Sequence, residues 1–119
     1  NIMSFGSPAI DYIEENLDLN RFLIRHSVAT YFMKMSGDAM RNAGIFDGDV
    51  LVVDRAQEPK TDSIIVAELN GELTIRRLKY YKGQTWLKAE NEYYPPERVL
   101  NTDNFNIWGI VTSVVRKLH

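Results

Sequence analysis

The sequence contains no cysteine and only two histidines, His26 and His119. Without cysteine there can be no disulfide, no thiolate zinc site and no cysteine nucleophile, which fits a reducing compartment. The histidines lie far apart in the sequence, so a histidine-based triad or a two-histidine metal site is disfavoured. We therefore interpret both histidines as exposed or locally paired.

Long apolar runs are also missing. No stretch approaches the ~18 residues of a membrane span, and the N-terminus lacks a basic region followed by a hydrophobic one, so we interpret the protein as cytoplasmic. The formal net charge is −2, so any contact with DNA needs a local basic patch or a partner. There is no repeat, phosphate-binding loop or metal-ligand spacing.

What is present fits one globular domain, with 45% hydrophobic and 25% charged residues in a chain of 119. Asn70-Gly71 lies between two apolar runs and is the strongest short hairpin signal. Gly109 is expected to bend the last strand. Tyr93 to Pro96 should form a loop, because proline has no amide hydrogen to donate to a neighbouring strand. The pattern predicts a mainly β, mostly antiparallel fold with strands over residues 29–35, 50–54, 63–69, 72–80, 85–89 and 105–115.

The N-terminal region is predicted to differ from the rest. Residues 1–16 are interpreted as a flexible arm, and residues 17–119 as the β domain. Ile10, Ile13 and Leu17 recur near helical spacing, and Asp18 is placed to cap a short helix over residues 19–24. No methionine precedes Asn1, which is consistent with a processed or truncated product.

Residues 35–40, Met-Ser-Gly-Asp-Ala-Met, form a polar, glycine-containing corner between two strands. They are followed by a short helical turn that Gly44 should end, and by the turn Asp47-Gly48-Asp49. Such a corner can present a reactive backbone, yet Ala39 in its middle has no reactive side-chain atom.

Ser36-Gly37-Asp38-Ala39-Met40 resembles the Ser-Gly-Asp-Ser-Met motif of the LexA/UmuD family of self-cleaving Ser-Lys peptidases. In that family the second serine is the nucleophile, and a lysine on the strand after the hairpin is its general base. The resemblance implies the mixed, mostly antiparallel β-fold of that family's C-terminal domain, with one or two short helices and no cofactor. Further matches in family order are Ala29-Thr30-Tyr31-Phe32, Asp47-Gly48-Asp49, Gly71-Glu72-Leu73-Thr74-Ile75 and Trp108-Gly109-Ile110-Val111.

This sequence departs from the family pattern at both catalytic positions. Ala39 occupies the position of the nucleophile and Arg76 that of the general base. A lysine can serve as base because burial holds it neutral, whereas a guanidinium stays protonated. Arg77 offers no replacement, and strand alternation places Lys79 on the face of Arg77 rather than that of Arg76. We expect the chain to be unable to cleave itself.

The resemblance implies a function in binding. Ser7-Pro8-Ala9 and Asp18-Leu19-Asn20 are closer to the UmuD branch than to the repressors. The family's scissile Ala-Gly or Cys-Gly dipeptide is absent, with Met3-Ser4 close to where it would align, so the chain resembles the processed form of that branch. That branch implies a homodimeric accessory subunit of error-prone translesion synthesis in the SOS response, with a UmuC-like Y-family polymerase subunit and the RecA filament as partners. Sequence-specific DNA binding is not expected, because there is no helix-turn-helix.

Two alternatives remain. In the first, the natural protein is an active self-cleaving peptidase and Ala39 is an engineered replacement of its serine. In the second, the chain is the dimerisation domain of a LexA-like or phage repressor. Arg76 favours natural loss of activity over engineering, because a single Ser→Ala change would already disable the enzyme.

Two surface features receive structural interpretations. The basic residues Arg76, Arg77, Lys79 and Lys82 are interpreted as a charge row that protects an exposed strand edge. Residues 105–115 are apolar enough to contribute to the core and to pair with a second copy. Five aromatic residues are interpreted as core and cross-strand packing rather than as stacking platforms for bases: Tyr80, Tyr81, Trp86, Tyr93 and Tyr94.

Overall fold

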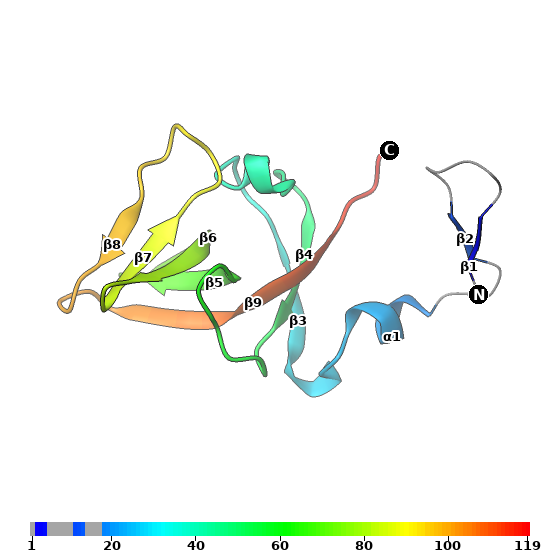
Figure 1. The fold of residues 1–119 in the computed structure, drawn as a ribbon, viewed down its shortest axis with the longest axis horizontal. Coiled ribbons are helices and arrows are strands. Elements are labelled where there is room, and N and C mark those ends of the chain that lie inside the picture. Colours follow the sequence, from blue (N-terminus) through cyan, green and yellow to red (C-terminus); the bar gives the residue numbers. More distant parts are fainter. Residues whose placement is uncertain (1, 5–10, 14–17) are drawn as a thin grey trace.

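The computed structural model describes residues 2–4, 11–13 and 18–119. Figure 1 labels the elements, and the expected mainly β fold is confirmed. Helical elements are α1 (Leu19–Leu23) and the 3-10 turns η1 (Ser27–Ala29) and η2 (Arg41–Ala43). The strands are β1 (Ile2–Ser4), β2 (Asp11–Ile13), β3 (Thr30–Lys34), β4 (Val50–Asp54), β5 (Ile64–Leu69), β6 (Glu72–Tyr81), β7 (Gln84–Lys88), β8 (Glu97–Val99) and β9 (Phe105–Val115).

The N-terminal predictions have mixed outcomes. The short capped helix is confirmed, because the Asp18 carboxylate accepts hydrogen bonds from the amides of Asn20 and Arg21 at the start of α1. The helical spacing of the apolar residues is misleading at Asp11–Ile13, because this segment forms strand β2 and pairs antiparallel with Ile2–Ser4. Tyr12 and Ile13 are aromatic and β-branched, and once a partner strand is available these residues favour extended backbone. The other residues of the predicted arm, namely 1, 5–10 and 14–16, lie outside the described residues.

Seven strands form one sheet in the order β3-β4-β9-β5-β6-β7-β8, and every pair in it is antiparallel. The long strand β9 pairs with β5 along its first half and with β4 along its second, with register shifts on both sides. The predicted bend at Gly109 lies at this crossing, where an added Cβ would be 2.6 Å from Val53 Cγ1. Glycine is needed there because the neighbouring strand comes so close.

Tight turns join β5 to β6, as the sequence predicted, and β6 to β7. Asn70 and Gly71 have φ values of 52° and 85°, the left-handed conformation that a two-residue hairpin turn requires. Lys82 and Gly83 form a similar turn between β6 and β7. The short strand β8 was not predicted, because prolines precede it and its three residues carry no apolar alternation.

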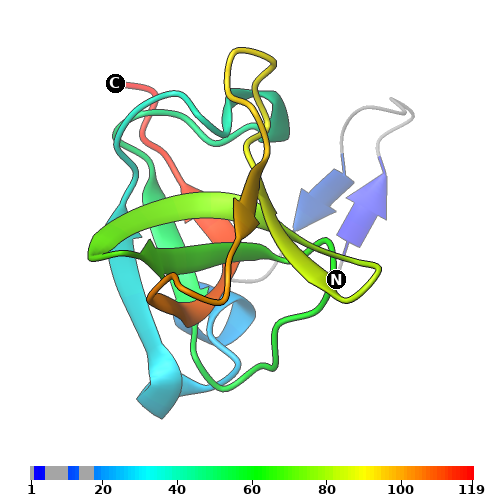
Figure 2. The same cartoon turned by 90° about the vertical axis from the view of Figure 1, so that its left-hand side faces the viewer.

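The sheet curls back on itself, so that β5 and β6 run across β3 and β4 rather than beside them (Figure 2). This curl gives the domain two apolar clusters. The first includes Met35, Met40, Leu51 and Val66 and lies inside the curl. The second includes Ile65, Leu78 and Leu87 and lies on the opposite face, beneath β7 and β8.

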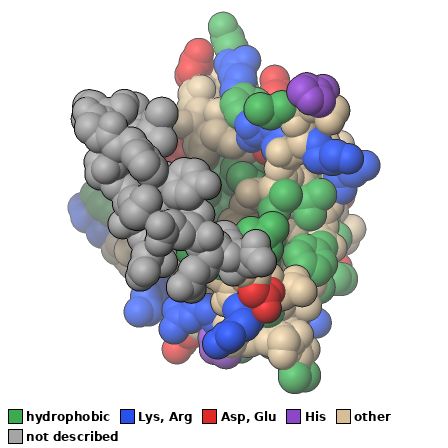
Figure 3. Space-filling view, turned by 90° about the vertical axis from the view of Figure 1, so that its right-hand side faces the viewer, with side chains coloured by type: hydrophobic (Ala, Val, Ile, Leu, Met, Phe, Trp, Pro, Cys, Tyr) green, Lys and Arg blue, Asp and Glu red, His purple; other side chains and the backbone are tan. Residues whose placement is uncertain are grey.

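Several large apolar side chains remain on the surface. On β9, Trp108, Val114 and Val115 are each more than a third exposed. Figure 3 shows apolar side chains grouped on the face of the molecule turned to the right in Figure 1. No helix within the described ranges is long and apolar enough to cross a membrane.

Candidate functional site

The corner at residues 36–39 is shaped by backbone hydrogen bonds to the turn that follows it. Met35 donates its amide to the Asp49 carbonyl, and Gly48 donates to the Met35 carbonyl, both at 2.8 Å. Gly37, with φ of +86°, donates its amide to Asp47 Oδ1 at 2.7 Å. The glycine-rich turns predicted from the sequence therefore hold residue 39 in one position, with its side chain buried.

Arg116, beyond the end of β9, ties this turn to the sheet. Its Nε lies 2.6 Å from Asp49 Oδ1, and its Nη2 lies 2.8 Å from Asp49 Oδ2 and 2.9 Å from the Gly44 carbonyl oxygen. Its guanidinium also covers the Phe46 ring at 4.6 Å. The hydrogen bonds from Arg116 lower the pKa of the almost fully buried Asp49, despite the burial, and so keep it ionised.

Ala39 and Arg76 line the same pocket, which has a volume of about 300 Å³. They lie 37 positions apart in the sequence, and β6 carries Arg76 across to the corner because the sheet curls. The structure therefore brings together the two residues that the sequence singled out. The other lining residues come from the end of β3, the corner, β6 and a loop: Met33, Lys34, Met35, Ser36, Gly37, Asp38, Leu73, Thr74, Ile75 and Tyr94.

Tyr94 closes one side of this pocket and contacts both halves of it. Its hydroxyl donates to Asp38 Oδ1 at 2.6 Å, and its ring centre lies 5.6 Å from the Arg76 guanidinium carbon. Because the phenol donates to a carboxylate, the pKa of Tyr94 is raised above its ordinary value. Arg76 also donates from Nη1 to the Ile75 carbonyl at 2.8 Å.

The loop that carries Tyr94 is fastened to the corner by Asn91. This buried amide donates from Nδ2 to the Asp38 carbonyl at 3.0 Å and accepts from the Tyr93 amide through Oδ1. Asn42 in η2 donates its backbone amide to the Glu90 carbonyl at 2.8 Å. No local pattern marks Asn91, Tyr94 or Arg116 as site residues, because their contacts depend on segments far apart in the chain.

Ala39 and Arg76 contribute a methyl group and a guanidinium to the pocket, and a guanidinium does not act as a base near neutral pH. Lys34 and Ser36 also line the pocket, and both residues are exposed. Beside these side chains the pocket presents the backbone of the corner.

Two open strand edges border the pocket. β3 pairs with β4 alone among the described strands, and the part of β6 before Arg77 pairs with β5 but not with β7. Unpaired backbone groups on such edges can bind an extended segment by adding a strand. The site is thus suited to holding a peptide beside Ala39.

Other residues singled out from the sequence have ordinary structural partners. His26 Nδ1 lies 2.7 Å from Asp54 Oδ2, which confirms the local pairing. Arg77 and Lys79 both contact Asp62, as alternation predicted, and Arg77 also pairs with Glu90. In the described part of the chain no group of three or more His, Asp or Glu side chains is arranged to hold a metal ion.

Two interpretations of β6 and its surroundings have divided outcomes. The basic residues cannot protect an edge at Arg77, because β6 pairs there with both β5 and β7, but Arg76 lies where β6 pairs with β5 only and Lys79 where it pairs with β7 only. Core packing is wrong for Tyr80, Tyr81 and Tyr93, which are 51%, 59% and 80% exposed. Cross-strand pairing is found for Tyr80 with Thr85 and for Tyr81 with Gln84.

The chain is similar in sequence to a known protein family and to several known proteins. The family model described as Peptidase S24-like matches residues 3–112. Protein ImpA of Escherichia coli is 42% identical over 113 residues, which cover 95% of this chain and 77% of that protein. Protein MucA of Escherichia coli is 38% identical over 109 residues, covering 91% and 74%. The LexA repressor of Bordetella parapertussis is 37% identical over 113 residues, covering 93% and 52%.

Proposed function

The chain belongs to the peptidase S24-like family, and we propose that it acts there by binding rather than by cleavage. Its function is that of a UmuD-like accessory subunit of an error-prone translesion DNA polymerase in the SOS response, in the cytoplasm. The observation that carries this proposal is the pocket that Ala39 shares with Arg76, in a chain whose relatives include ImpA, SamA and MucA.

We assign Ala39 to the nucleophile position and Arg76 to the general-base position of a disabled Ser-Lys site. Either residue alone is sufficient to stop the reaction, since one lacks an attacking atom and the other a lone pair. Arg76 moreover lies against the Tyr94 ring and donates to the Ile75 carbonyl, so a guanidinium occupies the place where a Ser-Lys peptidase needs an amine. The corner then serves the fold and the binding of extended segments.

The partners proposed for the chain are a second copy of itself, a UmuC-like Y-family polymerase subunit and the RecA filament. The exposed apolar side chains of β9, including Val114 and Val115, support pairing with a second copy. The open edges of β3 and β6 support capture of a strand from another chain or from the N-terminal region.

The disabled site can be tested without knowing a cleavage sequence, by reaction with a serine-directed fluorophosphonate. We expect the wild-type chain and Arg76→Lys to remain unlabelled at residue 39. The double variant A39S/R76K should be labelled, because it restores a hydroxyl and a base whose pKa burial can lower. A39S alone should react at least about a hundred-fold more slowly than A39S/R76K, because a general base accelerates a reaction by about a hundred-fold or more.

Intact-protein mass spectrometry at several pH values measures the labelling, with peptide mapping to locate the adduct. Thermal unfolding of each variant checks that the fold is retained. If A39S reacts as fast as A39S/R76K, Arg76 is not at the base position and our account of the site is wrong. Equal labelling rates of A39S and A39S/R76K would support the alternative that the protein is an active peptidase that lacks only its serine.

The match to a LexA repressor supports a second candidate, the dimerisation domain of a repressor. Such a domain would share the fold and the pairing with a second copy, but not the binding of a polymerase subunit. Mixing the chain with such a subunit therefore distinguishes the two functions.

A further inference from the structure

We propose that the outer face of the three-stranded ladder β6-β7-β8 is a binding surface for single-stranded DNA. We call it the ladder face and define it by Arg77, Lys79, Tyr81, Gln84, Trp86, Lys88 and Arg98. It lies apart from the pocket of Ala39 and Arg76, and the proposal goes beyond the proposed function without resting on it.

Strand register places these side chains on one face. Arg77 lies opposite Lys88, Lys79 opposite Trp86, Tyr81 opposite Gln84, and Trp86 opposite Arg98. Directly opposed residues of antiparallel strands point to the same side of the sheet. The alternate residues Leu78 and Leu87 are buried in the second apolar cluster, so the ladder face is the side turned away from that cluster. Ile75, two residues before Arg77 on the same side of β6, belongs to the first cluster.

The ladder face carries an excess of positive charge in a protein whose net charge is −2. Two of its cations have counterions, since Arg77 pairs with Glu90 and Lys79 with Asp62. Neither Lys88 nor Arg98 belongs to an ion pair within the described residues, and both are exposed. Lys82 adds a further cation at the hairpin turn, 5.2 Å from the centre of the Tyr81 ring. Five cations against two carboxylates leave three positive charges for phosphate groups.

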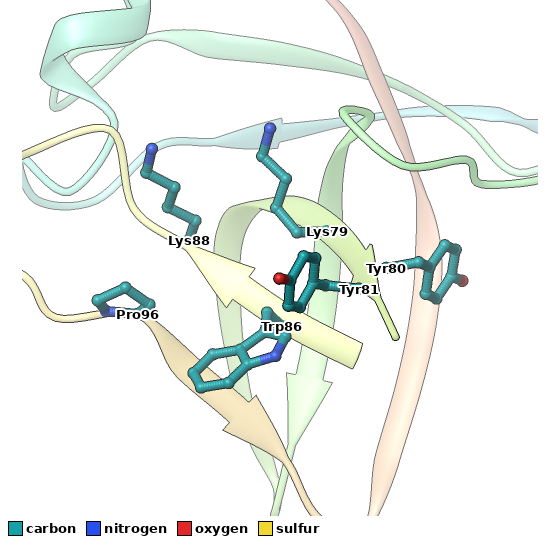
Figure 4. Close-up of a pocket in the computed structure, with 6 residues that line it drawn as sticks. All are labelled: Lys79, Tyr80, Tyr81, Trp86, Lys88 and Pro96. Carbon is teal, nitrogen blue, oxygen red and sulfur yellow. The ribbon is translucent and has the colours of Figure 1, made fainter. Parts of the chain in front are cut away.

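An apolar slot runs through this positive surface. Its volume is about 350 Å³, and five of its lining residues are Lys79, Tyr81, Trp86, Lys88 and Pro96. Tyr80 also lines it, although alternation places this side chain on the other side of β6. Figure 4 shows the Trp86 ring between Tyr81 and Pro96, with the ammonium groups of Lys79 and Lys88 extending on the same side. The Trp86 indole nitrogen donates to Gln84 Oε1 at 3.1 Å, so the ring is held in place by a neighbour on the same face.

This combination fits an unpaired polynucleotide better than other ligands. Aromatic rings bind the flat faces of bases, and flanking lysines bind the phosphates, which is how sequence-independent single-strand sites are built. A duplex hides its base faces within the stack and would leave the slot empty. A proline-rich peptide would fill the slot but would leave Lys88 and Arg98 without anionic partners.

The walls of the slot favour DNA over RNA. Tyr81, Trp86 and Pro96 present mainly carbon to the ligand, so a 2′-hydroxyl pressed against them would lose water without gaining a hydrogen bond. Deoxyribose carries no such group. We therefore expect a deoxyribose oligonucleotide to bind more tightly than the ribose oligonucleotide of equivalent sequence.

The test is fluorescence anisotropy of a labelled 15-mer oligo(dT), titrated with the protein at several salt concentrations. We expect Tyr81→Ala and Trp86→Ala each to weaken binding about ten-fold, the effect of losing one base stack. Lys88→Gln should weaken binding and reduce the slope of log K against log salt by about 0.7. The matched controls Phe22→Ala and Lys117→Gln change exposed residues away from the ladder face and should change neither quantity.

A second measurement keeps the test independent of whether Trp86→Ala folds. In a Trp108→Phe variant, Trp86 is the only tryptophan, so quenching of its fluorescence by oligo(dT) reports stacking on the ladder face. The proposal is overturned if oligo(dT) leaves this fluorescence unchanged, if the control variants weaken binding as much as Tyr81→Ala, or if oligo(rU) binds more tightly. If oligo(dT) leaves the Trp86 fluorescence unchanged and a proline-rich or acidic peptide quenches it, the face belongs to a protein partner and the proposal is overturned.

Discussion

Replacement of Arg116 by alanine is expected to loosen the corner from the sheet and to destabilise the whole domain. Removing one partner of a buried ion pair generally costs about 3–5 kcal/mol, because the other charge stays buried without compensation. Here Asp49 is 1% exposed, but the Arg116 side chain is 39% exposed, so water can enter as the guanidinium leaves. We therefore expect a loss of about 2–3 kcal/mol in the free energy of unfolding.

For a domain of this size, that loss corresponds to a fall in Tm of roughly 8–12 °C. Circular dichroism during heating and urea titration would measure it. Arg116→Lys retains the charge but loses the paired hydrogen bonds, so its stability should be intermediate. Arg25→Ala removes an exposed arginine and is the control. Adding Asp49→Asn to the Arg116→Ala variant should recover part of the loss, because no buried charge then remains. A change below about 0.5 kcal/mol for Arg116→Ala would refute the reasoning.

Two further predictions concern the sheet. Burial raises the pKa of Asp54, but hydrogen bonds from His26, Gln57 and the Ala56 amide outweigh it and leave the pKa at about 2, below the ordinary 3.8. The stability that Asp54 contributes is therefore complete above about pH 4 and lost as the pH falls towards 2, and Asp54→Asn should flatten that part of a urea-midpoint profile. Gly109→Ala should cost about 2 kcal/mol or more, because its Cβ would be 2.6 Å from Val53 Cγ1 and 3.0 Å from the Asp54 carbonyl; unchanged thermal stability would show that β4 and β9 separate easily.

Local signals in the sequence predicted most of the fold. Asn70-Gly71 specifies a tight turn through a backbone conformation that few residue pairs adopt, and the apolar runs beside it specify strands. Asp18 specifies the start of α1 through its side-chain hydrogen bonds. These features depend on a few neighbouring residues, so they can be read without knowing the rest of the structure.

Long-range features were not accessible in this way. The pairing of Asp11–Ile13 with Ile2–Ser4 overrides a helical spacing, and β8 forms only because β7 offers it a partner. The same applies to the site. The family motif predicted Ala39 and Arg76, but Tyr94, Asn91 and Arg116 reach the corner through loops and strand ends whose positions the curled sheet determines.

The aromatic residues show that burial, too, is hard to predict from the sequence. Tyr81 and Trp86 are the kind of residues that usually pack in a β-rich core, and their composition alone favours burial. The register of β6 and β7 places them instead on the same side as Lys79 and Lys88. Whether an aromatic residue packs inside or forms a binding platform depends on one step of register, which the sequence does not specify.

We propose that this member of the peptidase S24-like family works as a binding subunit. The most direct test is the mass in solution by light scattering, for the chain alone and mixed with a UmuC-like Y-family polymerase subunit. We predict twice the 13.7 kDa of one chain for the protein alone, and a larger complex that contains both proteins in the mixture. A monomer that elutes separately from the polymerase subunit would contradict the account.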